Sequence, residues 1–163
     1  MRRPKPKPPR DDPDDAHAAG LRLLARREHG VLELARKLRQ RGFTAEAADA
    51  GVERLVAEGL LSERRFAEAL ARHRMAQGYG ESRIRAELAQ HGIEAADIGH
   101  AIGELEVDWV ARAMDQARRH FGLPPDTSDD RQRVLRHLLQ RGFAMATAKA
   151  GLARWRENEH SSG

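Results

Sequence analysis

The stretch that decides the fold is Leu38-Arg39-Gln40-Arg41-Gly42-Phe43, because it occurs three times along the chain. The same pattern returns as Leu88-Ala89-Gln90-His91-Gly92-Ile93 and as Leu138-Leu139-Gln140-Arg141-Gly142-Phe143, so that successive glycines are 50 positions apart. Glycine adopts the left-handed conformation that ends many helices, and the residues four before it and one after it then form an apolar contact. The repeat therefore predicts three structural helix caps, at Gly42, Gly92 and Gly142.

Each predicted cap joins two helices. The segment after the first glycine places Ala48, Val52 and Leu55 at the i, i+4, i+7 spacing of one buried stripe, and the other copies repeat this spacing. A further helix is expected before each pair, at about 16–28, 63–77 and 107–121. In the first of these we expect Leu21, Leu24 and Ala25 to face inward.

We therefore predict an all-α protein of three tandem three-helix repeats, at residues 16–61, 62–106 and 107–157. Because units of about 50 residues bury only a marginal core alone, they should stack into an elongated, curved right-handed or solenoid-like body. Residues 1–15 contain five of the seven prolines and almost nothing to bury, so we expect a flexible tail there. Residues 158–163 are expected to form a disordered C-terminus.

Composition and missing motifs argue against an enzyme. The chain has no cysteine, so it has no disulfide and no thiolate zinc site. It contains no phosphate-binding loop, no zinc-protease helix and no nucleophile elbow. No run of about 20 apolar residues is present for a membrane span. We expect a cytoplasmic, non-enzymatic protein without catalytic residues, cofactors or metal.

One binding alternative is a DNA-binding transcriptional regulator of the helix-turn-helix type, with 34–55 as the motif. Such a motif needs two helices joined by a short turn, and its second helix should carry basic or amide groups that meet DNA. The second helix carries Glu46, Asp49 and Glu53 in the first copy, which phosphate would repel. Only the third copy, with Lys149 and Arg154, has a suitable sign.

The other binding interpretation comes from a resemblance. The central segment from Leu61 to Ile93 contains the motifs Leu61-Ser62-Glu63-Arg64-Arg65-Phe66-Ala67 and Gly78-Tyr79-Gly80. These motifs, together with the first and last glycine caps, resemble the RecX family, and the resemblance covers residues 16–156.

The resemblance implies a regulator of DNA repair and homologous recombination. It implies binding in the groove of the RecA protein filament on single-stranded DNA, and inhibition of the recombinase, ATPase and coprotease activities in the SOS response. We also expect a monomer, with at most weak binding to free DNA and none to membranes. We expect the filament or DNA contacts to be made by residues around the central loop: Arg65, Arg72, Arg74, Tyr79, Arg83 and Arg85. The structural alternative is that Arg83 pairs with Glu87 and Tyr79 only packs the loop.

Overall fold

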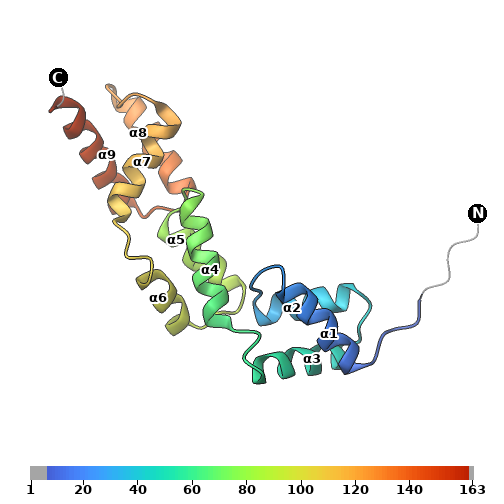
Figure 1. Cartoon of the computed structure of the whole chain (residues 1–163). Helices are drawn as coiled ribbons and strands as arrows, with labels where there is room; N and C mark the ends of the chain where they lie inside the picture. The colour runs from blue at the N-terminus through green and yellow to red at the C-terminus, as the bar shows by residue number, and fades with distance from the viewer. Residues whose placement is uncertain (1–6, 162–163) are drawn as a thin grey trace, which may run out of the picture. The chain divides into compact units, whose positions relative to one another are not determined.

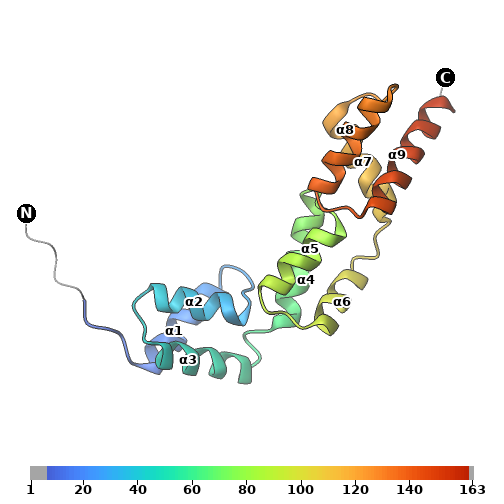
Figure 2. The same cartoon turned by 180° about the vertical axis from the view of Figure 1, so that it is seen from behind.

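The computed structural model describes residues 7–161, in which nine α-helices and no β-strand are found (Figures 1 and 2). The predicted all-α class with three helices per repeat is confirmed; the curvature of the whole body stays a prediction. The helices are α1 (Pro13–Leu24), α2 (Val31–Gln40), α3 (Ala45–Ala57), α4 (Glu63–Ala76), α5 (Glu81–Gln90), α6 (Ala95–Gly103), α7 (Trp109–Phe121), α8 (Ser128–Gln140) and α9 (Met145–His160).

The described chain divides into two compact units. The first contains residues 7–69 together with 91–93, and the second contains residues 70–90 together with 94–161. Helix α4 contributes its first half to one unit and its second half to the other. In the first unit α1, α2 and α3 form one helical bundle, and in the second α7, α8 and α9 form another (Figure 1).

The core of the first bundle differs from the sequence expectation in α1. Leu21 is 37% exposed and Ala25 is exposed, so the predicted inward stripe is wrong at these two positions, whereas Leu24 is partly buried and packs against the core as predicted. The buried face instead carries Ala16, Ala19, Gly20 and Leu23. The reason is close helix packing: a Cβ placed on Gly51 of α3 would lie only 3.0 Å from the Ala16 Cβ. Small residues, and not the largest apolar ones, therefore set the orientation of α1.

The N-terminal segment is more ordered than predicted for residues 1–15. Helix α1 begins at Pro13 because the Asp12 carboxylate caps it, accepting a 2.8 Å hydrogen bond from the Asp14 amide, and proline suits the first helical turn. Before it, the Arg10 N–H donates to the Gly42 carbonyl at 2.8 Å, and the Arg10 guanidinium lies 4.0 Å from the Phe43 ring centroid. Residues 1–6 of the predicted tail lie outside the described residues.

The C-terminal boundary also differs. Helix α9 continues to His160, and the Ser161 amide donates to the Glu157 carbonyl at 3.1 Å, so the predicted disorder from residue 158 is not found up to Ser161. Residues 162–163 lie outside the described part of the chain. The core of this second bundle surrounds Trp155 and Leu138, both fully buried, and α9 approaches α7 closely where Gly151 meets Ala113.

The repeated glycines all have positive φ: +93° at Gly42, +75° at Gly92 and +92° at Gly142. In the first copy the Phe43 N–H donates to the Leu38 carbonyl at 3.2 Å and the Gly42 N–H to the Arg39 carbonyl at 2.9 Å. These two bonds are those of a Schellman motif. The third copy repeats both bonds, each at 3.0 Å.

Truncation of Leu88 should destabilise the protein strongly. The side chain is fully buried in α5, so Leu88→Ala removes buried apolar volume and is expected to cost about 2–5 kcal/mol in the free energy of unfolding. The measurement is urea unfolding followed by circular dichroism. Leu139→Ala, at a position that is 40% exposed, is the matched control. Equal small losses for both variants would contradict the burial of Leu88.

Candidate functional site

The central loop between α4 and α5 holds the only tyrosine of the chain, and two guanidinium groups lie near its ring. The Arg83 guanidinium carbon lies 4.2 Å from the Tyr79 ring centroid, and that of Arg141 lies 4.0 Å from it. Both distances are within the range of cation–π attraction. The Tyr79 side chain is half-buried, and both arginines contact its ring.

This loop begins with a glycine cap that the 50-residue repeat did not predict. Gly78 has φ +84°, its N–H donates to the Met75 carbonyl at 3.0 Å, and the Tyr79 N–H donates to the Arg74 carbonyl at 3.1 Å. The pattern is again a Schellman motif. It ends α4 and places Tyr79 immediately after the helix.

The other side of the loop is joined to the third repeat through the backbone. The Gly80 N–H donates to the Arg141 carbonyl at 2.9 Å, and the Ser82 N–H donates to the Gly142 carbonyl at 3.0 Å. Two glycines make this approach possible, because a Cβ on Gly80 would lie 2.4 Å from the Phe143 nitrogen and one on Gly142 would lie 2.2 Å from the Arg83 Cβ. The loop and the third cap therefore form one packed junction.

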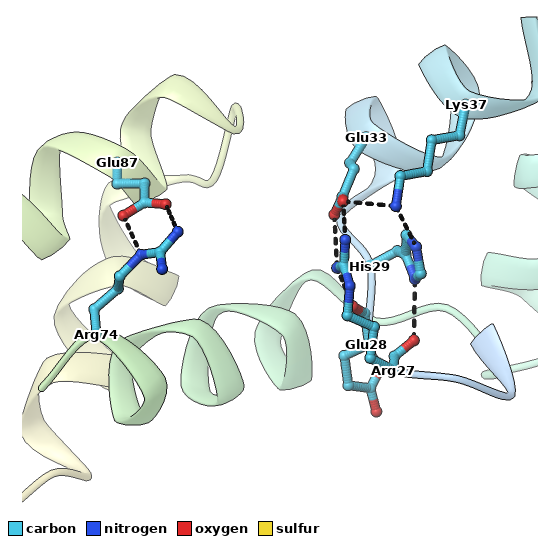
Figure 3. A network of polar contacts seen from close by, with 7 residues as sticks. All are labelled: Arg27, Glu28, His29, Glu33, Lys37, Arg74 and Glu87. Atoms are coloured by element: carbon cyan, nitrogen blue, oxygen red, sulfur yellow. Dashed lines mark hydrogen bonds and ion pairs between the residues drawn. The ribbon is translucent and has the colours of Figure 1, made fainter. Parts of the chain in front are cut away.

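Arg74 forms a two-pronged ion pair with Glu87 across α4 and α5 (Figure 3). Its Nε and Nη2 donate to the two Glu87 carboxylate oxygens at 2.8 and 2.7 Å. The hydrogen bonds that Arg74 donates to the Glu87 carboxylate raise the pKa of Arg74 above its ordinary value. Both residues line a shallow depression of about 380 Å³ together with Tyr79, Arg83, Ala86 and Gln90. Arg74 is thus oriented, but its charge is largely compensated.

The remaining predicted contact residues have different surroundings. Arg72 is exposed on α4, and its side chain has no hydrogen bond or ion pair with the rest of residues 7–161. Arg85 is exposed and pairs with Glu81 at 2.9 Å. Arg65 belongs to the first unit, where it pairs with Glu28 at 3.0 Å and donates to the Gly59 carbonyl. Of the predicted set, the structure brings together only Arg74, Tyr79 and Arg83.

Sequence reasoning missed Arg141 as part of this site. Its position in the third glycine cap was recognised, but arginine also occurs at the corresponding place in the first cap, as Arg41. Residue type and spacing therefore did not distinguish a cap residue that contacts Tyr79 from one that faces solvent. The partner of Arg141 lies about 60 residues away in the chain, and only the fold joins them.

A second polar cluster lies in the first unit and connects α2 to the loop before it (Figure 3). Arg27 pairs with Glu33, and the Lys37 Nζ lies 3.2 Å from the same carboxylate. Lys37 also donates to the His29 Nε2 at 3.0 Å. Because an ammonium only donates, this nitrogen must accept, and the His29 Nδ1 then donates to the Arg27 carbonyl at 3.0 Å.

The surroundings lower the pKa values of two residues in this cluster, Glu33 and His29. Burial alone would raise the pKa of Glu33, but hydrogen bonds from Arg27 and Lys37 outweigh it and lower that pKa to about 2. Burial lowers the pKa of His29 below its ordinary value. The cluster is an ordered link between α2 and the preceding loop, and nothing in it resembles a catalytic arrangement.

Replacing Glu33 should give a stability loss that depends on pH. Because the folded-state pKa is lower than that of the unfolded chain, ionised Glu33 stabilises the fold above about pH 4.5, and this contribution disappears as the pH falls toward 2. Glu33→Gln is expected to cost about 1–3 kcal/mol at pH 7, since it leaves charged donors poorly paired. Urea unfolding of both proteins at pH 7, 4.5 and 3 measures the effect. A pH-independent difference would contradict this account.

The comparisons with known proteins agree on one family. Family models match the chain as the first three-helix domain of RecX at residues 16–55, the second at 62–102 and the third at 106–151. The chain belongs to the RecX family. A regulatory protein RecX of Pseudomonas putida (strain GB-1) is 48% identical over 136 residues, which cover 83% of this chain and 87% of the relative. The RecX of Pseudomonas entomophila (strain L48) is 46% identical over 136 residues, 83% of this chain and 88% of that relative.

Solved RecX structures have the same fold. The crystal structure of RecX from Lactobacillus salivarius has a TM-score of 0.73 at 18% identity and covers 89% of this chain and 97% of that chain. A second RecX crystal structure has a TM-score of 0.70 at 22% identity, with coverage of 84% and 70%. The loop with Tyr79 lies in the second RecX domain, and Arg141 lies in the third. Among residues 7–161 no helix combines the length and apolar character that a membrane crossing requires.

Proposed function

We propose that this RecX protein is a non-enzymatic, cytoplasmic regulator of the RecA recombinase. It acts as a monomer, binds the groove of the RecA filament on single-stranded DNA, and lowers ATP hydrolysis, strand exchange and coprotease activity. Two observations support the proposal: membership in a family whose curated relatives are named regulatory protein RecX, and a prearranged arginine-rich surface on the second domain.

The observation that carries the proposal is the arrangement around Tyr79. We call Arg74, Tyr79 and Arg83 the Tyr79 surface, and we propose that the exposed Arg72 of α4 and Arg85 of α5 extend it. Arg72, Arg83 and Arg85 are exposed, and guanidinium groups suit two-pronged contacts with carboxylates or phosphates. Arg83 is already oriented by the Tyr79 ring, so it loses little side-chain entropy on binding. Arg74, paired with Glu87, supports this surface and is not itself the main contact.

The alternative, a helix-turn-helix DNA-binding regulator, is less well supported. In the first domain the helix that would read DNA is α3, and Glu46, Asp49 and Glu53 are exposed on it. Carboxylates on that face would meet the phosphate backbone at a cost. The one basic residue of α3, Arg54, is exposed but pairs with Asp14 and Glu58.

Direct binding measurements separate the two functions. Fluorescently labelled protein is titrated with RecA assembled on single-stranded DNA, with single-stranded DNA alone and with duplex DNA, each at several salt concentrations. The proposal expects much tighter binding to the filament than to either DNA. Equal affinity for bare single-stranded DNA, or tight sequence-selective binding to duplex DNA with none to the filament, would refute it.

A further inference from the structure

Arg141 connects the third domain to the proposed contact surface of the second. We infer that Arg141 is a positioning residue, which holds Tyr79 and through it Arg83 in the orientation used for filament binding. This inference rests on the proposed function and adds a regulatory link to it: the cap of the third domain sets the geometry of the Tyr79 surface.

Arg141 contacts the loop through both its side chain and its backbone. Its guanidinium stacks on the Tyr79 ring at 4.0 Å, its Nη2 donates to the Gln77 carbonyl, and its backbone carbonyl accepts from the Gly80 N–H at 2.9 Å. The three contacts fall on three residues of the loop from Gln77 to Gly80. Each restrains a different part of the turn that carries Tyr79.

The Tyr79 ring has two cationic neighbours. The guanidinium group of Arg83, four residues further along the chain, lies over the Tyr79 ring. The guanidinium group of Arg141, from the third domain, lies over the same ring. Without Arg141 the ring loses one of its two cationic neighbours and the restraint on Gln77. Arg83 then has a less fixed partner, so the free protein samples more orientations of this group and its ordering on binding costs more.

One donor nitrogen of the Arg141 side chain is buried. The Arg141 Nε is buried and has no hydrogen-bond partner within the described residues. Leaving such a group unpaired is unfavourable. The Arg141 side chain is therefore packed into the junction with the loop, and its Nη2 donates to the Gln77 carbonyl. The observation separates Arg141 from an arginine that simply extends into solvent.

The repeat supplies an internal comparison. Arg41 occupies the corresponding position of the first cap, and it is exposed, with no side-chain hydrogen bond, ion pair or ring contact to any residue between 7 and 161. The second cap has His91 there, with its ring edge-to-face with Phe66 at 5.0 Å. The contacts of Arg141 are therefore not a general property of the glycine cap. Arg41→Ala is a control that removes the same side chain from an equivalent cap.

The experiment compares wild-type protein with Arg141→Ala, Arg141→Lys and Arg41→Ala. Nuclear magnetic resonance follows the ring signals of Tyr79, the only tyrosine, and hydrogen exchange of the Gly80 and Ser82 amides. Loss of one cation–π contact and of the Gln77 restraint is expected to speed these exchanges roughly tenfold and to weaken filament binding by about the same factor. Arg41→Ala should change neither. Lysine keeps the charge but not the planar group, so Arg141→Lys should resemble Arg141→Ala, which also covers the case that the alanine variant folds poorly.

A double-mutant cycle distinguishes positioning from general stability. If Arg141 acts through Tyr79 and Arg83, the effects of Arg141→Ala and Arg83→Ala on filament affinity are not additive, whereas those of Arg141→Ala and Arg72→Ala are. Unchanged exchange and ring signals, unchanged filament affinity, or additivity with Arg83→Ala would overturn the inference. Absence of filament binding by the wild-type protein would instead refute the proposed function.

Discussion

Gly142→Ala is expected to destabilise this RecX protein by roughly 2–5 kcal/mol, from backbone strain and overpacking together. Gly142 has φ +92°, and an added Cβ would lie 2.2 Å from the Arg83 Cβ and 2.9 Å from the Arg83 nitrogen. The clash cannot be relieved by a flexible side-chain end, because the Arg83 atoms belong to or adjoin the backbone. The substitution should separate the loop with Tyr79 from the third cap.

Gly42→Ala is the matched control for this prediction. Its φ of +93° is nearly the same, but a Cβ there would meet no atom within 4 Å. Only the left-handed strain remains, at about 1–2 kcal/mol. Urea unfolding of the three proteins gives the comparison. Equal losses for the two variants would show that the close packing of Gly142 on Arg83 contributes nothing.

The double variant Arg72→Ala/Arg83→Ala is expected to lose most of its filament binding. Both side chains are exposed, and Arg83 is preoriented by Tyr79. Removing two arginines from the centre of an interface costs at least about 2–3 kcal/mol in total, or roughly a 30- to 150-fold weaker Kd. Neither is buried in the core, so the melting temperature should remain near that of the wild type. Binding is measured by titrating labelled protein with RecA filaments.

A control with the same change of charge comes from the first domain. Arg36→Ala/Arg39→Ala removes two exposed arginines of α2 whose side chains form no ion pair within residues 7–161. If the Tyr79 surface makes the contact, this control binds filaments nearly as well as the wild type. Equal losses for both double variants would indicate that binding depends on overall positive charge and would exclude a localised surface.

The helices and their ends were largely predictable because their causes are local. The glycine caps depend on backbone conformation within six residues, and the buried stripes after them depend on spacing along one helix. The orientation of α1 was not predictable from hydrophobicity. Its small residues Ala16 and Gly20 face the core because α3 approaches closely, with Leu55 against Gly20 and Gly51 against Ala16. That approach is a property of two helices together.

The ends of the chain and the candidate site show the same limit. Arg10 is ordered by Gly42 and Phe43, and Arg141 is placed on Tyr79, in both cases by contacts between distant parts of the sequence. The prediction that six residues cluster around the central loop rested on nearness in the chain. Arg65 instead pairs with Glu28 in the first unit, because the direction in which a helical side chain points decides its partner.

ATP turnover by RecA on single-stranded DNA is the measurement that tests the proposed function most directly. With RecA and DNA fixed, wild-type protein is added from far below to above the RecA concentration, beside Arg72→Ala/Arg83→Ala. The account predicts that the wild type suppresses turnover while still well below one molecule per RecA protomer, and that the double variant needs far more. Turnover that stays constant with the wild type in excess over RecA would contradict the account.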